Sequence, residues 1–223
     1  MSPERRAFRA ASRATPVALA VAVSLALIVT LSLALPGCGR PRGSASAPEA
    51  GVAREPAASR AAEPSLHELT FPLTDANGRV RHLSEFRGQP FVASMIYTHC
   101  TSVCPRITAD LQALDRALPP ELREHTRFVL FSLDPARDTP AALTAFASDR
   151  HLDLARWTLL AAGAEDMRTL AAVLDVRFRP DAGGEIAHSA VIVVVDRAGV
   201  IRHRQAGLTG DPAPLVAAVR AVQ

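Results

Sequence analysis

The chain has 223 residues, and its 25 basic residues, all of them arginine, against 22 acidic residues give a formal net charge of +3. Part of the small basic excess lies near the N-terminus, no cluster of arginines alternates with aromatic residues, and the chain has one tryptophan and one tyrosine. The composition therefore argues against a nucleic-acid-binding protein. Hydrophobic residues make up 48% of the chain, which is enough to bury a sizeable core in one domain of about 160 residues.

Residues 1–38 have the layout of an export signal. Arginines at Arg5, Arg6, Arg9 and Arg13 precede an uncharged apolar run over 17–35, which is also long enough to span a bilayer of about 30 Å. The run ends in Leu35-Pro36-Gly37-Cys38, which resembles a bacterial lipobox, and Arg5-Arg6-Ala7-Phe8 resembles a twin-arginine signal. A lipid anchor, an uncleaved helical anchor and free secretion remain open. All three place the globular part outside the cytoplasm, because the positive residues precede the apolar run.

Residues 39–64 separate this signal from the folded part. They are rich in Ala, Gly, Pro, Ser and Arg and hold hardly any large apolar side chain. Such a segment buries too little surface to order itself, so we expect a flexible tether. It would let the domain reach a membrane-embedded partner, or it would serve only as a spacer. Residues 65–223 are then the single folded domain.

The first half of the domain predicts a hairpin, a strand and a helix. Asp75-Ala76-Asn77-Gly78 contains an Asn-Gly turn signal between short extended segments at 71–74 and 79–82. The near-continuous apolar run over 91–97 predicts a strand buried on both faces. Apolar residues at helical spacing over 105–118 predict a helix that Pro119-Pro120 ends.

The second half alternates predicted strands and helices. Strands are predicted at 127–133, 157–160, 190–195 and 200–204, and helices at 140–150, at 165–174 and from Asp211 onward. The alternation predicts a partly parallel sheet flanked by helices, and the late antiparallel pair makes that sheet mixed. The pattern fits an α/β, thioredoxin-like fold with an N-terminal β-hairpin.

The folded domain carries two cysteines, Cys100 and Cys104, because Cys38 belongs to the export signal. They lie directly after the predicted strand over 91–97 and directly before the following helix. Unpaired N–H groups at the helix N-terminus give it a partial positive charge, which favours the thiolate of Cys104. Two thiolates at such a place can close a disulfide or hold a soft metal ion.

A structural disulfide is the simplest alternative for this pair in an exported protein. The loop between Cys100 and Cys104 is so short, however, that a bridge would restrict the unfolded chain little. The position therefore favours reversible chemistry. The spacing alone leaves a redox pair and a metal site both open.

Three segments resemble motifs of the SCO/SenC family. Residues 97–105 resemble its CxxxCP motif, residues 132–140 match its pattern S-x-D-P-x-x-D-T-P, and residues 175–199 match its third motif, in which His188 precedes an apolar strand. The likeness runs in the right order from about Leu69 to the C-terminus. One departure is Thr101, where the family commonly has proline, and it predicts a less rigid loop and a slightly altered redox balance.

The resemblance implies that Cys100, Cys104 and His188 are copper ligands. Thiolate sulfur is a soft donor that suits Cu(I), and imidazole also accommodates Cu(II), so this set accepts a copper ion in either state. Zinc more typically takes a fourth ligand or a water molecule.

The remaining histidines are not expected to bind an ion together with the cysteines. The side chain of His99 is expected to point away from that of its neighbour Cys100. Five others are expected at the surface: His67, His82, His125, His151 and His203.

Acidic and aromatic residues complete the predictions for the domain. Asp134 is expected either to support the cysteine site from the sheet edge or to cap a turn. Arg137 and Asp138 are expected to form a local ion pair or cap that contributes little energy. Trp157 and Phe178 are expected in the core.

By this resemblance the chain is a membrane-anchored copper chaperone on the extracytoplasmic, periplasmic side of the cell envelope. Its expected partner is the copper acceptor, cytochrome c oxidase subunit II. The alternative is a thiol-disulfide oxidoreductase, in which Cys100 and Cys104 reduce the cysteines of that acceptor. Redox proteins of the thioredoxin type usually carry CxxC, and redox exchange does not need His188. A peroxidase shares the fold but is the weakest reading of this cysteine pair.

Overall fold

The computed structural model describes residues 64–223. The predicted export signal and nearly all of the predicted tether therefore lie outside the described residues. Within the described part, no helix is both long enough and apolar enough to cross a bilayer.

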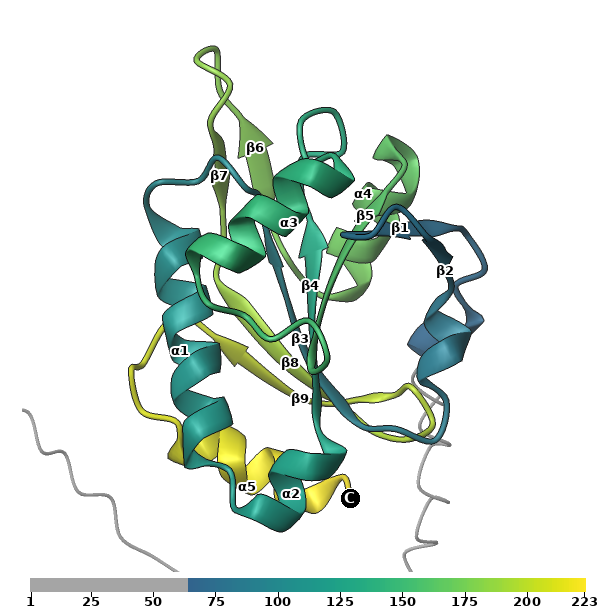
Figure 1. Ribbon diagram of the computed structural model, residues 1–223, viewed down its shortest axis with the longest axis vertical. Helices are drawn as coiled ribbons and strands as arrows, with labels where there is room; N and C mark the ends of the chain where they lie inside the picture. The colour runs from purple at the N-terminus through teal and green to yellow at the C-terminus, as the bar shows by residue number, and fades with distance from the viewer. Residues whose placement is uncertain (1–63) are drawn as a thin grey trace, which may run out of the picture. The chain divides into compact units, whose positions relative to one another are not determined.

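One mixed sheet forms the centre of the domain, with helices packed on it (Figure 1). The strands are β1 (Leu73–Asp75), β2 (Val80–Arg81), β3 (Phe91–Ile96), β4 (Arg127–Ser132), β5 (Trp157–Ala162), β6 (Phe178–Pro180), β7 (Ile186–His188), β8 (Val191–Val195) and β9 (Ile201–Ala206). The α-helices are α1 (Val103–Ala117), α2 (Pro120–His125), α3 (Pro140–Asp149), α4 (Ala164–Val173) and α5 (Ala213–Ala221). Two short 3₁₀ helices, η1 (Leu66–Glu68) and η2 (Leu83–Phe86), lie near the start.

The order of strands in the main sheet is β2-β1-β5-β4-β3-β8-β9. The pairs β3·β4 and β4·β5 are parallel, whereas β1·β2, β1·β5, β3·β8 and β8·β9 are antiparallel. The predicted mixed α/β sheet with an N-terminal hairpin is therefore confirmed. α1 contacts α5 and β3, and α3 and α4 contact β5.

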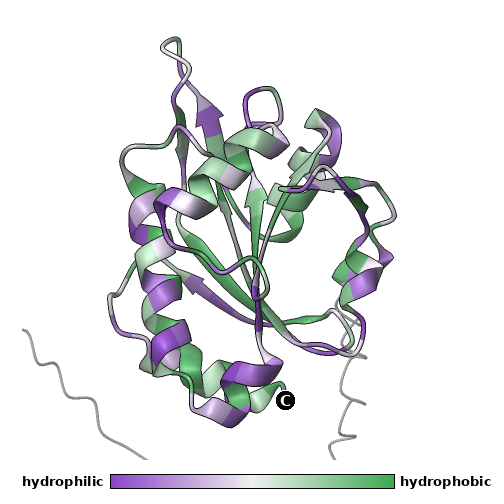
Figure 2. Ribbon diagram, in the orientation of Figure 1, coloured by the Kyte–Doolittle hydropathy of each residue, from purple (hydrophilic) through white to green (hydrophobic). Residues whose placement is uncertain are grey.

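The apolar runs become the central strands because both faces of those strands are covered. Every residue of β3 and of β8 is buried, and Figure 2 shows the central strands as the hydrophobic part of the domain. Trp157 is 3% exposed and stacks on Phe128 with ring centroids 4.5 Å apart. Phe178 packs against this core while partly buried. Both aromatic residues thus lie where they were expected.

Some boundaries and small elements differ from the sequence prediction. α1 begins at Val103, two residues earlier than expected, so Cys104 lies inside its first turn. Pro119-Pro120 does end that helix, but Pro120 then opens α2, since a proline in the first turn needs no N–H partner. The hairpin of β6 and β7 was not predicted at all, because each of its strands has only three residues.

His67 is not at the surface, contrary to prediction. It is 2% exposed, because η1 packs against the turn between β8 and β9. The Leu66 N–H donates to the Gly199 carbonyl at 2.8 Å, and the Ser65 hydroxyl donates to the Ala198 carbonyl at 2.6 Å. Of the other histidines expected at the surface, His203 is half-buried and the remaining three are exposed.

Candidate metal centre

Three segments that are far apart in the sequence meet at one end of the central sheet. Cys100 lies in the loop that follows β3, Cys104 lies in the first turn of α1, and His188 is the last residue of β7. The parallel pairing of β3 with β4 brings the carboxyl ends of both strands to this edge, where sites in such sheets form. The fold therefore unites the three residues that the resemblance named.

The three side chains are close enough to share one ion. The Cys104 Sγ lies 3.3 Å from the His188 Nε2, and the Cys104 N–H donates to the Cys100 Sγ at 3.3 Å. One potential ligand atom from each of the three residues lies within 4.8 Å of the others. In the described part of the chain, no fourth His, Cys, Asp or Glu joins this group.

The two thiols differ in their electrostatic surroundings. Burial opposes ionisation of Cys100, but hydrogen bonds from the Cys104 thiol and from the backbone N–H groups of Cys104 and Ser102 outweigh it and lower the pKa of Cys100. Burial, followed by the hydrogen bond to the Cys100 sulfur, raises the pKa of Cys104. Cys100 is thus the more acidic thiol of the pair. The expectation that the helix N-terminus favours the thiolate of Cys104 is wrong, because burial dominates the pKa of this thiol.

His188 is held in the form that a metal ion requires. Its Nδ1 lies 3.1 Å from the Ser189 carbonyl, which can only accept a hydrogen bond, so Nδ1 carries the proton and Nε2 faces Cys104 with its lone pair. Burial lowers the pKa of His188, although the bond to Ser189 acts the other way. The imidazole is consequently neutral and oriented before any ion arrives.

The donor set fits copper. Two sulfurs suit the soft Cu(I) ion, and an imidazole nitrogen suits Cu(I) and Cu(II) alike. A structural zinc site would ordinarily close its tetrahedron with a fourth protein ligand, and the described residues supply none within this group.

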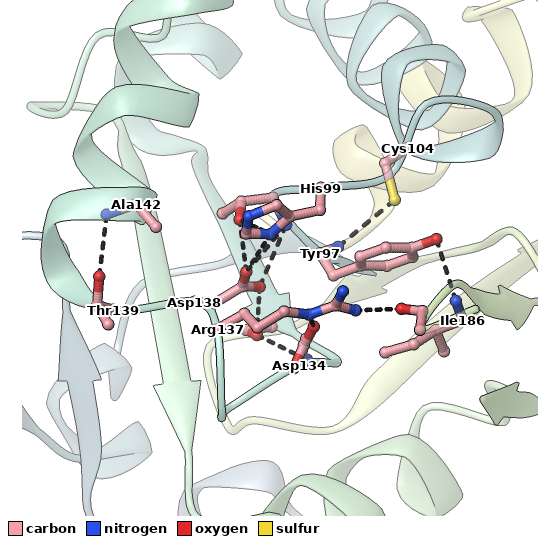
Figure 3. A network of polar contacts seen from close by, with 12 residues as sticks. Tyr97, His99, Cys104, Asp134, Arg137, Asp138, Thr139, Ala142 and Ile186 are labelled. Carbon is pink, nitrogen blue, oxygen red and sulfur yellow. Dashed lines mark hydrogen bonds and ion pairs between the residues drawn. The ribbon is translucent and has the colours of Figure 1, made fainter. Parts of the chain in front are cut away.

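His99 stands apart from the three donors. Its side chain is 53% exposed and lies beside Asp138 (Figure 3). Its Nδ1 lies 3.0 Å from the Thr98 hydroxyl. It does not belong to the group of donor atoms around Cys100.

Asp138 is the clearest correction to the sequence analysis. It is not a weak local cap, since it is 2% exposed and its carboxylate accepts hydrogen bonds from three donor groups. The Thr98 N–H donates at 3.1 Å and the Thr98 hydroxyl at 2.6 Å to Oδ1, and the Ser132 hydroxyl donates at 2.6 Å to Oδ2. Asp138 therefore ties the loop that carries Cys100 to the end of β4.

Arg137 pairs with Asp134 and not with Asp138, as Figure 3 shows. Its guanidinium also donates to the Gly184 carbonyl in the turn between β6 and β7. Of the two roles open for Asp134, the structure favours support for this edge of the sheet, because its carboxylate holds the arginine that reaches the hairpin of His188.

Tyr97 is the residue of the site that sequence analysis missed. Its hydroxyl donates to the Glu185 carboxylate at 2.7 Å and accepts from the Ile186 N–H at 3.2 Å. Its ring meets that of His188 edge-on, with centroids 6.0 Å apart. The sequence did offer one signal, the lone tyrosine at the end of a predicted buried strand. Because a buried phenol requires a hydrogen-bond partner, this tyrosine indicated a polar contact at the edge of the sheet.

Comparison with known protein families identifies the same part of the chain. Residues 59–223 match the family model described as SCO1/SenC. The SCO1 protein homolog of Bacillus subtilis is 24% identical over 148 residues, which cover 64% of this chain and 75% of that protein.

Solved structures share the fold. A crystal structure from Aquifex aeolicus is 28% identical, covers 71% of this chain and 93% of its own, and superposes with a TM-score of 0.64. The structure of Bradyrhizobium japonicum ScoI with copper bound is 25% identical, covers 69% of this chain and 97% of its own, and gives a TM-score of 0.54.

Proposed function

The chain belongs to the SCO1/SenC family, and from that premise we propose that it is an extracytoplasmic copper chaperone for the copper centre of cytochrome c oxidase. Copper is the cargo, and Cys100, Cys104 and His188 are its proposed ligands. The observation that carries the proposal is the convergence of these two sulfurs and one imidazole nitrogen within 4.8 Å. The copper-bound structure of the Bradyrhizobium japonicum relative supports the choice of ion.

The arrangement suits delivery by ligand exchange. Cys100 lies on a loop, whereas Cys104 is fixed in α1 and fully buried. An acceptor thiolate would therefore replace Cys100 more readily than Cys104, and Cys104 would be released last. A set of three soft and borderline donors binds copper firmly and still leaves room for an incoming ligand.

The proposed setting follows from the sequence outside the described residues. Residues 1–38 would anchor the chain in the membrane of the cell envelope, and residues 39–64 would tether the domain of residues 65–223 on the periplasmic side. Subunit II of the oxidase is the proposed acceptor, as the family resemblance implies. The length of the tether would let the domain reach a membrane-embedded partner.

A transfer experiment tests this function. The Cu(I)-loaded chain is mixed with the reduced, copper-free soluble domain of an oxidase subunit II, and the copper content of each protein is measured after separation. We expect copper to move to the acceptor from the wild-type chain, and the Cys104→Ser variant to carry too little copper to transfer. Copper that stays entirely on the loaded wild-type chain would contradict delivery.

Thiol-disulfide exchange is the second candidate, and the lowered pKa of Cys100 favours it. The Cys100 thiolate would attack an acceptor disulfide and release one acceptor thiolate. Cys104 would then displace the second acceptor thiolate, so that the acceptor gains two electrons and this chain ends as a disulfide. Reduction of an acceptor disulfide that persists in the His188→Ala variant and is lost in Cys100→Ser would support this function.

A further inference from the structure

His188 belongs to a hairpin that is separate from the main sheet. β6 and β7 pair only with one another, with Phe178 opposite His188, and Figure 1 shows this hairpin extending beyond the end of the sheet. The main sheet therefore does not fix the position of the His188 imidazole relative to the two cysteines. Other contacts must do so.

Tyr97 contacts both halves of the candidate metal centre. Its backbone belongs to the cysteine half, since the Cys100 N–H donates to the Tyr97 carbonyl at 3.2 Å and the Tyr97 N–H donates to the Cys104 Sγ at 3.5 Å. Its side chain belongs to the histidine half, through the hydrogen bonds of its hydroxyl with Glu185 and Ile186. Figure 3 shows the ring lying between Cys104 and Ile186.

The hydroxyl of Tyr97 has no substitute at this place. Tyr97 is 1% exposed and Ile186 is buried, so water cannot readily replace the phenol as the partner of the Ile186 N–H. Ile186 is two residues from His188 on the same strand and therefore points its side chain to the same face. A shift of the strand at Ile186 would move the imidazole directly.

Arg137 adds a second, outer attachment. It bridges Asp134 to the Gly184 carbonyl in the turn of the hairpin. The approach is close, because a Cβ on Gly184 would lie 3.2 Å from the Arg137 Nη1. This contact holds the tip of the hairpin, whereas Tyr97 holds the strand that carries His188.

We propose that Tyr97 is a positioning residue that sets the His188 imidazole against Cys100 and Cys104 through the bonds of its hydroxyl to Glu185 and Ile186. The inference rests on the proposed copper site and assigns the rigidity of that site to one phenol. A phenylalanine would keep the ring, its packing and its edge-on contact with His188. It would remove the hydroxyl, and with it both bonds to the hairpin and the contact of the phenol with the Cys100 sulfur.

The test is a double-mutant cycle on the full chain with Tyr97→Phe and His188→Ala. We expect Tyr97→Phe to weaken copper binding about tenfold, the equivalent of one hydrogen bond to a charged group. In the His188→Ala background the same change should weaken copper binding clearly less, because only the contact of the phenol with Cys100 is then lost. The nitrogen hyperfine coupling in the Cu(II) spectrum should weaken in Tyr97→Phe, which a general loss of stability would not produce.

Thr126→Val is the matched control. Thr126 is also buried and its hydroxyl donates a hydrogen bond to the Leu122 carbonyl at 2.7 Å, but it lies at the end of α2. The control should lose stability to a similar degree and keep wild-type copper affinity. The inference would be overturned if Tyr97→Phe weakened copper binding equally with and without His188. It would also be overturned if Tyr97→Phe kept the wild-type copper affinity and Cu(II) spectrum.

A measurement without copper separates this inference from the proposed function. In the metal-free chain, NMR contacts between the His188 ring and Cys104 should weaken in Tyr97→Phe and persist in Thr126→Val. If the wild-type chain bound no copper but showed this difference, the copper function would fail and the positioning role would stand. Unchanged NMR contacts in Tyr97→Phe would overturn the positioning role.

Discussion

Removal of the Asp138 carboxylate should destabilise the domain and release the loop of Cys100. In Asp138→Ala, the Ser132 hydroxyl loses its acceptor in a buried place, and the Thr98 N–H and hydroxyl lose theirs in a half-buried one. Each such loss costs about 1 to 3 kcal/mol, and relaxation of the loop recovers part of it, so we expect the free energy of unfolding to fall by about 3 to 5 kcal/mol.

Asp138→Asn distinguishes the charge from the hydrogen bonds. The amide oxygen can still accept from Thr98, while the Ser132 hydroxyl must rotate to accept from the amide nitrogen. Because only the charge assistance is lost, we expect a cost of about 1 to 2 kcal/mol. Glu165→Ala serves as the control, since the pair of Glu165 with Arg168 is exposed and should contribute less than about 1 kcal/mol.

Urea unfolding followed by fluorescence measures these costs, because Trp157 is the single tryptophan and is buried against Phe128. The rate at which Cys100 reacts with a thiol reagent in the native chain should rise in Asp138→Ala, since the loop is no longer tied to β4. A loss below about 1 kcal/mol in Asp138→Ala would refute the reasoning, because one buried and two half-buried donors without an acceptor should together cost more.

Two further predictions concern the other end of the domain, where η1 packs on the turn between β8 and β9. Gly199→Ala should destabilise the domain by about 2 to 4 kcal/mol in urea unfolding, since a Cβ there would lie 2.4 Å from the Ser65 hydroxyl oxygen. Gly207 has the same φ of +84° but nothing within 4 Å of such a Cβ, so Gly207→Ala should cost only about 1 kcal/mol for the left-handed backbone. Equal costs of the two changes would contradict the close packing of η1. Burial, with a smaller contribution from Arg87, lowers the pKa of His67 below its ordinary 6.5, so below pH 6.5 the unfolded chain binds a proton that the native chain does not, and the free energy of unfolding should fall as the pH drops. His67→Phe should flatten this dependence of the unfolding free energy on pH, measured by urea unfolding at several pH values. An unchanged slope in His67→Phe would show that His67 titrates alike in both states.

The parts of the fold that were predictable are those with a strong local pattern. The apolar runs of β3 and β8 could be identified because strands buried on both faces leave no polar alternation. The hairpin of β6 and β7 has three-residue strands and a burial pattern without a clear period, so the local sequence did not predict it. The SCO/SenC resemblance supplied His188 where the pattern could not.

The misjudged residues share one cause. Asp138 was interpreted from its sequence neighbours, but its main partner, Thr98, lies forty residues away and meets it only through the parallel pairing of β3 and β4. His67 was placed at the surface, but the turn at Gly199, more than a hundred and thirty residues away in the sequence, covers it. Tyr97 was passed over for the same reason, since Glu185 and Ile186 reach it from the hairpin.

Copper binding to the full chain tests the central claim most directly. The measurement is the copper stoichiometry and affinity of the reduced wild-type chain beside Cys100→Ser, Cys104→Ser and His188→Ala, by competition with a chelator of known affinity. The account predicts about one copper ion per chain, with binding severely weakened in each of the three variants, because each removes one of the three donors that residues 64–223 bring together. Wild-type affinity in His188→Ala would contradict the three-ligand site.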